Sequence, residues 1–213
     1  MSRGEDGGPQ PWPLWLAVGT LVFALLDVGH AAGLFTSSWL DPDREGTFPA
    51  AFSALLLAYA AMLARSLEIA TAARGRRVWR IMSIVFACMA IDEVLTIHEK
   101  LERSIGIDWQ VLYLPLILGG AGAGLYIVHL LRRDRLACGA WAAGGAAWAA
   151  SQWLEKLQWS GDVQVAGYVP MMVGEEILEM AGSLLLGIGM IVAHRAAVAG
   201  VRARPDGSAV PAE

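Results

Sequence analysis

The residues best suited to chemistry in this sequence are acids and histidines that interrupt long apolar stretches. They occur in the runs LLDVGHAAG, IDEVLTIHEKL and VGEEILEMAG. Carboxylates combined with imidazoles, and without thiolates, form a ligand set that suits iron or manganese better than structural zinc. The nine residues of this candidate metal site are Asp27, His30, Asp92, Glu93, His98, Glu99, Glu175, Glu176 and Glu179.

Helical spacing would bring several of these side chains onto common faces. At about 100° per residue, Glu175 and Glu179 are stacked at i, i+4, and Glu176 lies within the same arc. Asp27 and His30 have the i, i+3 spacing by which one helix offers a carboxylate and an imidazole to one ion. We therefore expect one face of the last apolar segment to be lined with carboxylates.

The run IDEVLTIHEKL is expected to belong to one continuous helix. Asp92, Thr96 and Glu99 then form one stripe, with Glu93 on one side of it and His98 on the other. Because a regular helix would not direct all four ionisable groups inward, the sequence alone leaves open which of them reach the site.

The chain has six apolar segments, three of which hold these residues, and their length predicts membrane-spanning helices. The chain has 213 residues, of which 56% are hydrophobic and 17% charged, which is too apolar for a soluble domain of this size. Each segment is about as long as the ~20 residues that are needed to cross ~30 Å of hydrocarbon. We predict an all-α integral membrane protein, a six-helix bundle over 13–195 with spans at about 13–35, 48–65, 79–101, 110–131, 138–158 and 169–194.

Two stretches rich in small residues, 119–124 and 139–150, are expected to let helices pack closely in lipid. The two cysteines, Cys88 and Cys138, fall at different depths in this arrangement. We therefore expect neither a disulfide nor a thiolate metal site.

The basic residues predict how the bundle is oriented. With six spans, one side carries 12 of the 16 Lys and Arg residues, and the positive-inside rule makes that side cytoplasmic. The N-terminal segment 1–12 and a disordered tail over 196–213 then both lie in the cytoplasm. The expected location is the plasma or inner membrane, with the lipid bilayer as the main partner. A net charge of −4 without a basic patch gives no indication of nucleic-acid binding.

All nine candidates fall in the half of the bilayer away from the cytoplasm. At ~1.5 Å per residue, Asp92 and Glu179 would lie ~14 Å from the outer ends of their spans. A charged group at that depth costs about 3 kcal/mol on insertion scales, and no Lys or Arg is placed at mid-depth to balance these acids. The missing positive charge must come from bound cations or from protons.

Bound cations would make this a buried metal site, with two carboxylate-bridged ions of iron or manganese. A redox-active pair of ions would suit a membrane oxidoreductase acting on a lipid or quinone that enters from the bilayer. No residue in the sequence identifies a catalytic step. This metal-site hypothesis predicts a lipophilic substrate and leaves its identity open.

Protons or mobile cations give the alternative, a proton-coupled or cation transporter or channel in which the same carboxylates act as a relay. The inner half of the bundle offers few polar groups to complete such a pathway, apart from Glu68 and His129 near the cytoplasmic ends. A third interpretation, in which the acids only cap helices or face water, suits Glu99 and also Glu175 and Glu176 near a helix N-terminus.

Overall fold

The computed structural model describes residues 12–44, 46–71, 73–160 and 163–202, and almost all of them are helical. The long helices are α1 (Trp12–Ala31), α2 (Phe48–Ala70), α3 (Ala73–Leu95), α6 (Leu114–Leu131), α7 (Arg135–Leu157) and α8 (Tyr168–Arg202). Two short helices, α4 (Ile97–Ile105) and α5 (Trp109–Leu112), lie between α3 and α6, and a small antiparallel pair, β1 (Trp159–Ser160) and β2 (Val163–Gln164), lies between α7 and α8.

Local sequence signals explain where several of these helices begin and end. Proline occupies the first turn of α2 and of α6, where its missing N–H costs no hydrogen bond. The Asp134 carboxylate caps α7 by accepting hydrogen bonds from the backbone N–H groups of Leu136 and Ala137. Gly106, in the left-handed conformation, ends α4.

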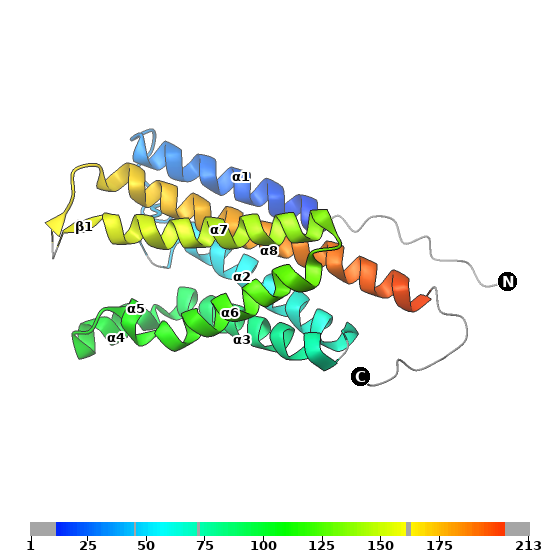
Figure 1. Ribbon diagram of the computed structural model, residues 1–213. Helices are drawn as coiled ribbons and strands as arrows, with labels where there is room; N and C mark the ends of the chain where they lie inside the picture. Colours follow the sequence, from blue (N-terminus) through cyan, green and yellow to red (C-terminus); the bar gives the residue numbers. More distant parts are fainter. Residues whose placement is uncertain (1–11, 45, 72, 161–162, 203–213) are drawn as a thin grey trace.

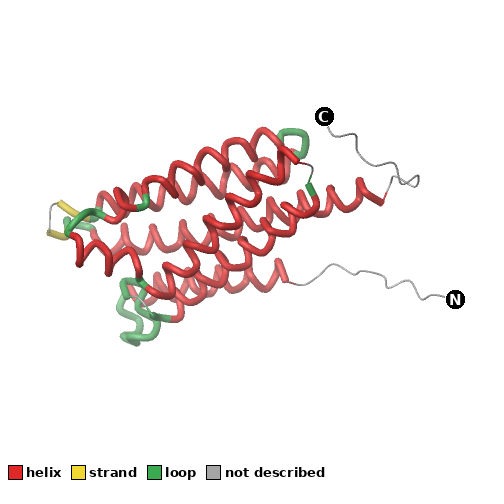
Figure 2. The backbone as a smooth tube through the Cα atoms, turned by 90° about the horizontal axis from the view of Figure 1, so that it is seen from below, coloured by secondary structure: helices red, strands yellow, loops and turns green. Residues whose placement is uncertain are grey.

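The long helices lie side by side and run along the bundle in alternating directions (Figure 1). Helix α8 is the most central, since it packs against α7, α2 and α1, while α3 packs against α2 and α6. The start of α1 and the end of α8 lie at the same end of the bundle, and the segment between α1 and α2 lies at the opposite end with the β1–β2 pair (Figures 1 and 2). We call the end with the start of α1 the terminal end and the other the hairpin end.

The packed interior combines aromatic residues, alanines and larger aliphatic side chains. Trp141 of α7 stands edge-on to Trp79, at a ring-centroid distance of 5.4 Å, and also contacts Phe86. Helices α7 and α8 approach most closely through glycines, because a Cβ atom on Gly144 would lie only 2.8 Å from the Gly182 carbonyl oxygen. This close approach confirms a packing role for part of the small-residue stretch 139–150.

Four of the described helical segments are long and apolar enough to cross a membrane: Leu14–Ala31, Phe48–Ala70, Leu114–Leu131 and Tyr168–Val198. The pair α3 and α4 gives a fifth if it is taken as one broken span. Helix α7 does not reach the same apolarity, because polar residues from Ser151 to Lys156 occupy its last turns. The protein is thus all-helical, with several helices suited to a multi-pass membrane protein.

The prediction of a continuous third helix over 79–101 is wrong. The chain bends by 73° between α3 and α4, at Thr96, which is the only described residue other than glycine with a positive φ (50°). The single stripe of Asp92, Thr96 and Glu99 therefore does not form, since a left-handed residue interrupts the helical repeat. At the C-terminus, α8 continues to Arg202, and the remainder of the predicted tail, like residues 1–11 of the predicted N-terminal segment 1–12, lies outside the described residues.

Candidate functional site

Asp27, in the last two turns of α1, is the most unusual side chain of the candidate set. It is 0% exposed, and neither of its carboxylate oxygens has a hydrogen-bond partner among the described residues. Helix α1 packs against α8, and Asp27 interacts electrostatically with Glu176 of that helix. A buried carboxylate without a partner is costly unless it takes up a proton or a cation.

The three glutamates of α8 lie beside one another, each partly buried. Glu179 accepts hydrogen bonds from the Ser151 hydroxyl (3.4 Å) and the Gln152 amide (3.2 Å), both on α7. Glu175 accepts a short hydrogen bond from the amide of Gln158, which directly follows α7. Helix α7 therefore supplies neutral donors to these carboxylates.

Glu93 of α3 completes a group of acids drawn from three helices. Electrostatic interactions connect it with both Glu176 and Glu179, and these two also interact with Glu175. We call the five residues the carboxylate cluster: Asp27, Glu93, Glu175, Glu176 and Glu179. Like charges this close in a low-dielectric interior cannot all remain ionised without added positive charge.

Asp92 and His98 form a second group, at the bend between α3 and α4. The His98 Nδ1 atom lies 2.6 Å from one carboxylate oxygen of Asp92, while the His98 backbone N–H donates to the other at 2.9 Å. The Tyr113 hydroxyl also donates to Asp92, at 2.9 Å. These contacts hold the chain across the left-handed residue Thr96, whose backbone conformation is unfavourable for a β-branched side chain.

Glu155 of α7 lies between the two groups. It accepts hydrogen bonds from the Trp109 indole (2.9 Å) and the Gln110 amide (3.3 Å), and the Trp109 ring lies against His98 with centroids 5.3 Å apart. Glu155 also interacts electrostatically with His98 and with Glu179. Ionisable groups therefore follow one another from α1, through α8, to the bend.

The two remaining candidates are directed elsewhere. The Nδ1 atom of His30 lies 4.0 Å from the Asp41 carboxylate, and its ring meets Phe35 edge-on. Glu99 pairs with Arg103 one turn later in α4, at 2.6 Å, with both side chains well exposed. Asp27 and His30 thus do not converge on one point, although both lie in the last turns of α1.

The described ranges contain no group of three or more His, Cys, Asp or Glu side chains arranged to hold a metal ion. Among the contacts of the imidazoles, the Nδ1 atom of His98 is bonded to Asp92 and that of His30 lies near Asp41. The side chains as placed therefore do not fit the two-histidine, dinuclear metal centre expected from the sequence.

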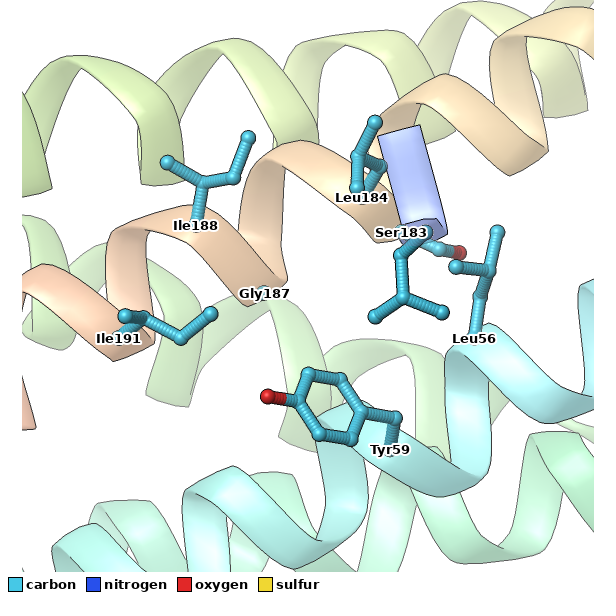
Figure 3. A pocket seen from close by; sticks show the side chains of 8 residues that line it. Leu56, Tyr59, Ser183, Leu184, Gly187, Ile188 and Ile191 are labelled. Carbon is cyan, nitrogen blue, oxygen red and sulfur yellow. The ribbon is translucent and has the colours of Figure 1, made fainter. Parts of the chain in front are cut away.

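A small cavity of about 10 Å³ lies further toward the terminal end, between α1, α2 and α8, which is about the space that one water requires. Its polar lining comes from Ser183, one helical turn beyond Glu179, and from Tyr59 of α2 (Figure 3). The other lining side chains are mainly Leu and Ile, and the Tyr59 hydroxyl points toward the Ile191 end of the cavity (Figure 3).

Sequence reasoning missed the neutral polar partners of these acids. Tyr113 is a partner of Asp92 and Ser151 of Glu179, and no spacing rule singles out either residue. Ser53 of α2 was missed for the same reason, although its hydroxyl is buried without a hydrogen-bond partner in the described part of the chain. Depth and helix register, known only from the fold, reveal their positions.

The fold and the site define an all-helical protein with membrane-type helices that surround buried carboxylates. The chain belongs to the family described as a domain of unknown function, DUF8692, whose model matches residues 14–194. The matched segment includes the carboxylate cluster and all the long helices except the ends of α1 and α8. No curated protein and no solved structure matches the chain.

Proposed function

We propose that the protein moves protons or a small cation across a membrane, with the carboxylate cluster as its binding site. The observation that carries this proposal is Asp27, a fully buried carboxylate with no hydrogen-bond partner in the described residues, beside the acids of α8. Such a carboxylate must take up a proton or a mobile cation, because the cluster contains no basic residue that compensates its charge.

For this transport function we propose six membrane spans with both termini in the cytoplasm. The membrane would be the plasma or inner membrane of the cell. Support comes from the alternating course of the helices and from the shared end at which α1 starts and α8 ends (Figure 1). Helix α7 would be the least apolar span, covered by its long contact with α8. The carboxylate cluster would then belong to the outer half of the bilayer.

Polar groups beyond the cluster support continuation toward the cytoplasm. Ser183 follows Glu179 by one turn of α8, and the cavity that it shares with Tyr59 has space for about one water. A proton leaving Glu179 would pass to a water there and next to the Tyr59 hydroxyl. Ser183 and Tyr59 would then add polar groups to the pathway beyond the carboxylate cluster.

The test is proton uptake by liposomes that contain the purified full chain, driven by an imposed membrane potential and followed with an internal pH dye. We expect uptake above that of empty liposomes, and a roughly tenfold slower rate for Glu179→Gln, which keeps the shape but removes the ionisable group. Glu99→Gln is the matched control, because Glu99 pairs with Arg103 outside the cluster. Parallel assays with divalent cations and an internal indicator separate proton from metal-ion movement. Wild-type liposomes no faster than empty ones in every assay would contradict the proposal.

A metal-dependent membrane oxidoreductase acting on a lipid or quinone is the second candidate. It is favoured by the hydrogen bond between Asp92 and His98 Nδ1, the arrangement by which a carboxylate orients a metal-binding imidazole. Iron or manganese would suit the carboxylate-rich surroundings better than zinc. The side chains would have to move closer together, since they are not grouped for metal binding in the described residues.

Elemental analysis of the detergent-purified chain tests this second candidate. Roughly one or two iron or manganese ions per chain would support it, provided that Asp92→Ala and Glu179→Ala reduce the content. A metal-free chain whose thermal midpoint is unchanged by a chelator would exclude it and leave transport as the function to test.

A further inference from the structure

The terminal end of the bundle carries a cleft of about 290 Å³ that the proposed transport site does not use. Its lining residues are Arg65, Glu68 and Ile69 at the end of α2, and Arg76 and Arg80 at the start of α3. We call it the arginine cleft.

Glu68 holds two of the arginines of this cleft in place. It is buried, at 2% exposure, and its two carboxylate oxygens accept hydrogen bonds from the guanidinium groups of Arg65 and Arg80, the latter at 2.7 Å. The two arginine side chains are themselves about 60% exposed. Their inner N–H groups are thus fixed by Glu68, while the outer ones face the cleft and its surroundings.

The arginine cleft has more positive charge than Glu68 requires. Arg76 adds a third guanidinium, and it makes no hydrogen bond or ion pair with any described residue. Three positive charges against one carboxylate leave a net charge of +2 at a site where two guanidiniums are already oriented. Arginine binds phosphate oxygens bidentately and is well suited to this type of recognition.

The position of the cleft indicates where the phosphate comes from. Its residues belong to the last turns of a membrane-type helix that ends at Ala70 and to the first turns of a segment that begins at Gly75, which is the level of lipid headgroups. Ile69, 71% exposed, gives the cleft an apolar wall beside the charges. Basic pockets between spanning helices bind anionic lipid headgroups in this way.

We propose that the arginine cleft binds the phosphate group of an anionic phospholipid. The lipid lies with its phosphate between Arg76 and the outer N–H groups of Arg65 and Arg80, and with its acyl chains along the apolar surface that starts at Ile69. This site is separate from the carboxylate cluster, so the inference stands whether or not the protein transports cations.

Native mass spectrometry of the detergent-purified full chain tests the proposal by counting bound lipids. The probes are phosphatidylglycerol and phosphatidylcholine with identical acyl chains, so that they differ in headgroup and net charge. We expect phosphatidylglycerol to bind at least about threefold more tightly, and Arg76→Gln to remove this preference. Arg77→Gln is the matched control, because Arg77 is the exposed neighbour that does not line the cleft.

A third arm adds inorganic phosphate as a competitor. Lipid binding that persists in millimolar phosphate supports a headgroup site, whereas displacement by phosphate together with loss of the lipid preference assigns the cleft to a free anion and overturns the lipid proposal. Equal binding of the two lipids, or equal losses in Arg76→Gln and Arg77→Gln, also overturns it. Thermal melting of both variants establishes that they are folded, and Arg76→Ala, which also removes the charge, replaces Arg76→Gln if that variant unfolds.

Discussion

Two carboxylates are almost completely buried at opposite ends of this bundle, and their surroundings differ completely. Glu68, near the terminal end, accepts hydrogen bonds from two guanidinium groups. Asp27, near the hairpin end, is equally buried and has no hydrogen-bond partner among the described residues. The same chemical group is therefore charge-compensated at one end of the molecule and uncompensated at the other.

The difference follows from what can reach each carboxylate. Arg65 and Arg80 have long side chains that extend from Glu68 to solvent, so each keeps part of its guanidinium hydrated. Asp27 instead lies where α1 packs against α8, and the ionisable group with which it interacts electrostatically is another acid, Glu176. A compensated buried charge stabilises a fold, whereas an uncompensated one persists where function needs it.

The first prediction removes the charge of the compensated carboxylate, Glu68. Glu68→Gln removes a charge that two arginines share, and we expect the free energy of unfolding to fall measurably, because two charge-assisted hydrogen bonds are weakened. Thermal melting in detergent measures this change as a drop of several degrees in the midpoint. Glu99→Gln, which breaks an exposed pair with Arg103, should change it by about 0.5 kcal/mol or less. Equal effects of the two substitutions would contradict a special role for Glu68.

The second prediction makes the same chemical change at the uncompensated end. Asp27→Asn should leave the thermal midpoint unchanged or raise it, by up to about 1 kcal/mol of stability, because the amide has the same shape without a charge to desolvate. The identical assay therefore gives results of opposite sign for two buried acids. A loss as large as that of Glu68→Gln would show that Asp27 has a compensating partner after all.

The sequence predicted the acids of α8 well and the third apolar segment poorly. Glu175, Glu176 and Glu179 lie together because their spacing fits a regular helix, and helical repeat is easily recognised. The break at Thr96 has no comparable signal, since neither glycine nor proline occurs in IDEVLTIHEKL. A threonine in the left-handed region is held there by long-range contacts, among them that of Tyr113 with Asp92.

The two small-residue stretches illustrate the same limit. Gly144 in the second stretch meets Gly182 of α8 at a distance that only glycine permits, whereas in the first stretch a Cβ atom on Gly120 would meet Val85 at an ordinary 3.4 Å and one on Gly119 would meet nothing within 4 Å. Composition identified both as packing faces, but the partner of a face depends on which helices become neighbours. The pairing of Glu68 with Arg80, twelve residues later, was missed for that reason too.

The smallest predicted effect concerns a third carboxylate, which is partly exposed and paired with a basic side chain. Asp108, before α5, accepts a hydrogen bond from Lys156 at 2.5 Å and another from the backbone N–H of Gln110 at 2.9 Å. The Lys156 ammonium, helped by this backbone donor and opposed by slight desolvation, lowers the pKa of Asp108 below the ordinary 3.8. A lowered pKa stabilises the fold above pH 3.8, and this contribution is lost as the pH falls through the folded value.

Lys156→Gln isolates this pair, because it removes the ammonium and keeps the hydrogen bond from Gln110. Both side chains are more than one-third exposed, so solvent screening limits the difference in stability to a few tenths of a kcal/mol, or about 0.5 at most. Melting curves of wild type and variant from pH 6 down to pH 3 should converge at the acid end, and about 1 M salt should shrink the gap at pH 6. A gap independent of both pH and salt would mean that Lys156 acts through packing. Asp108 would then lack electrostatic compensation from Lys156, and Glu68 alone of the three carboxylates would be compensated by basic side chains.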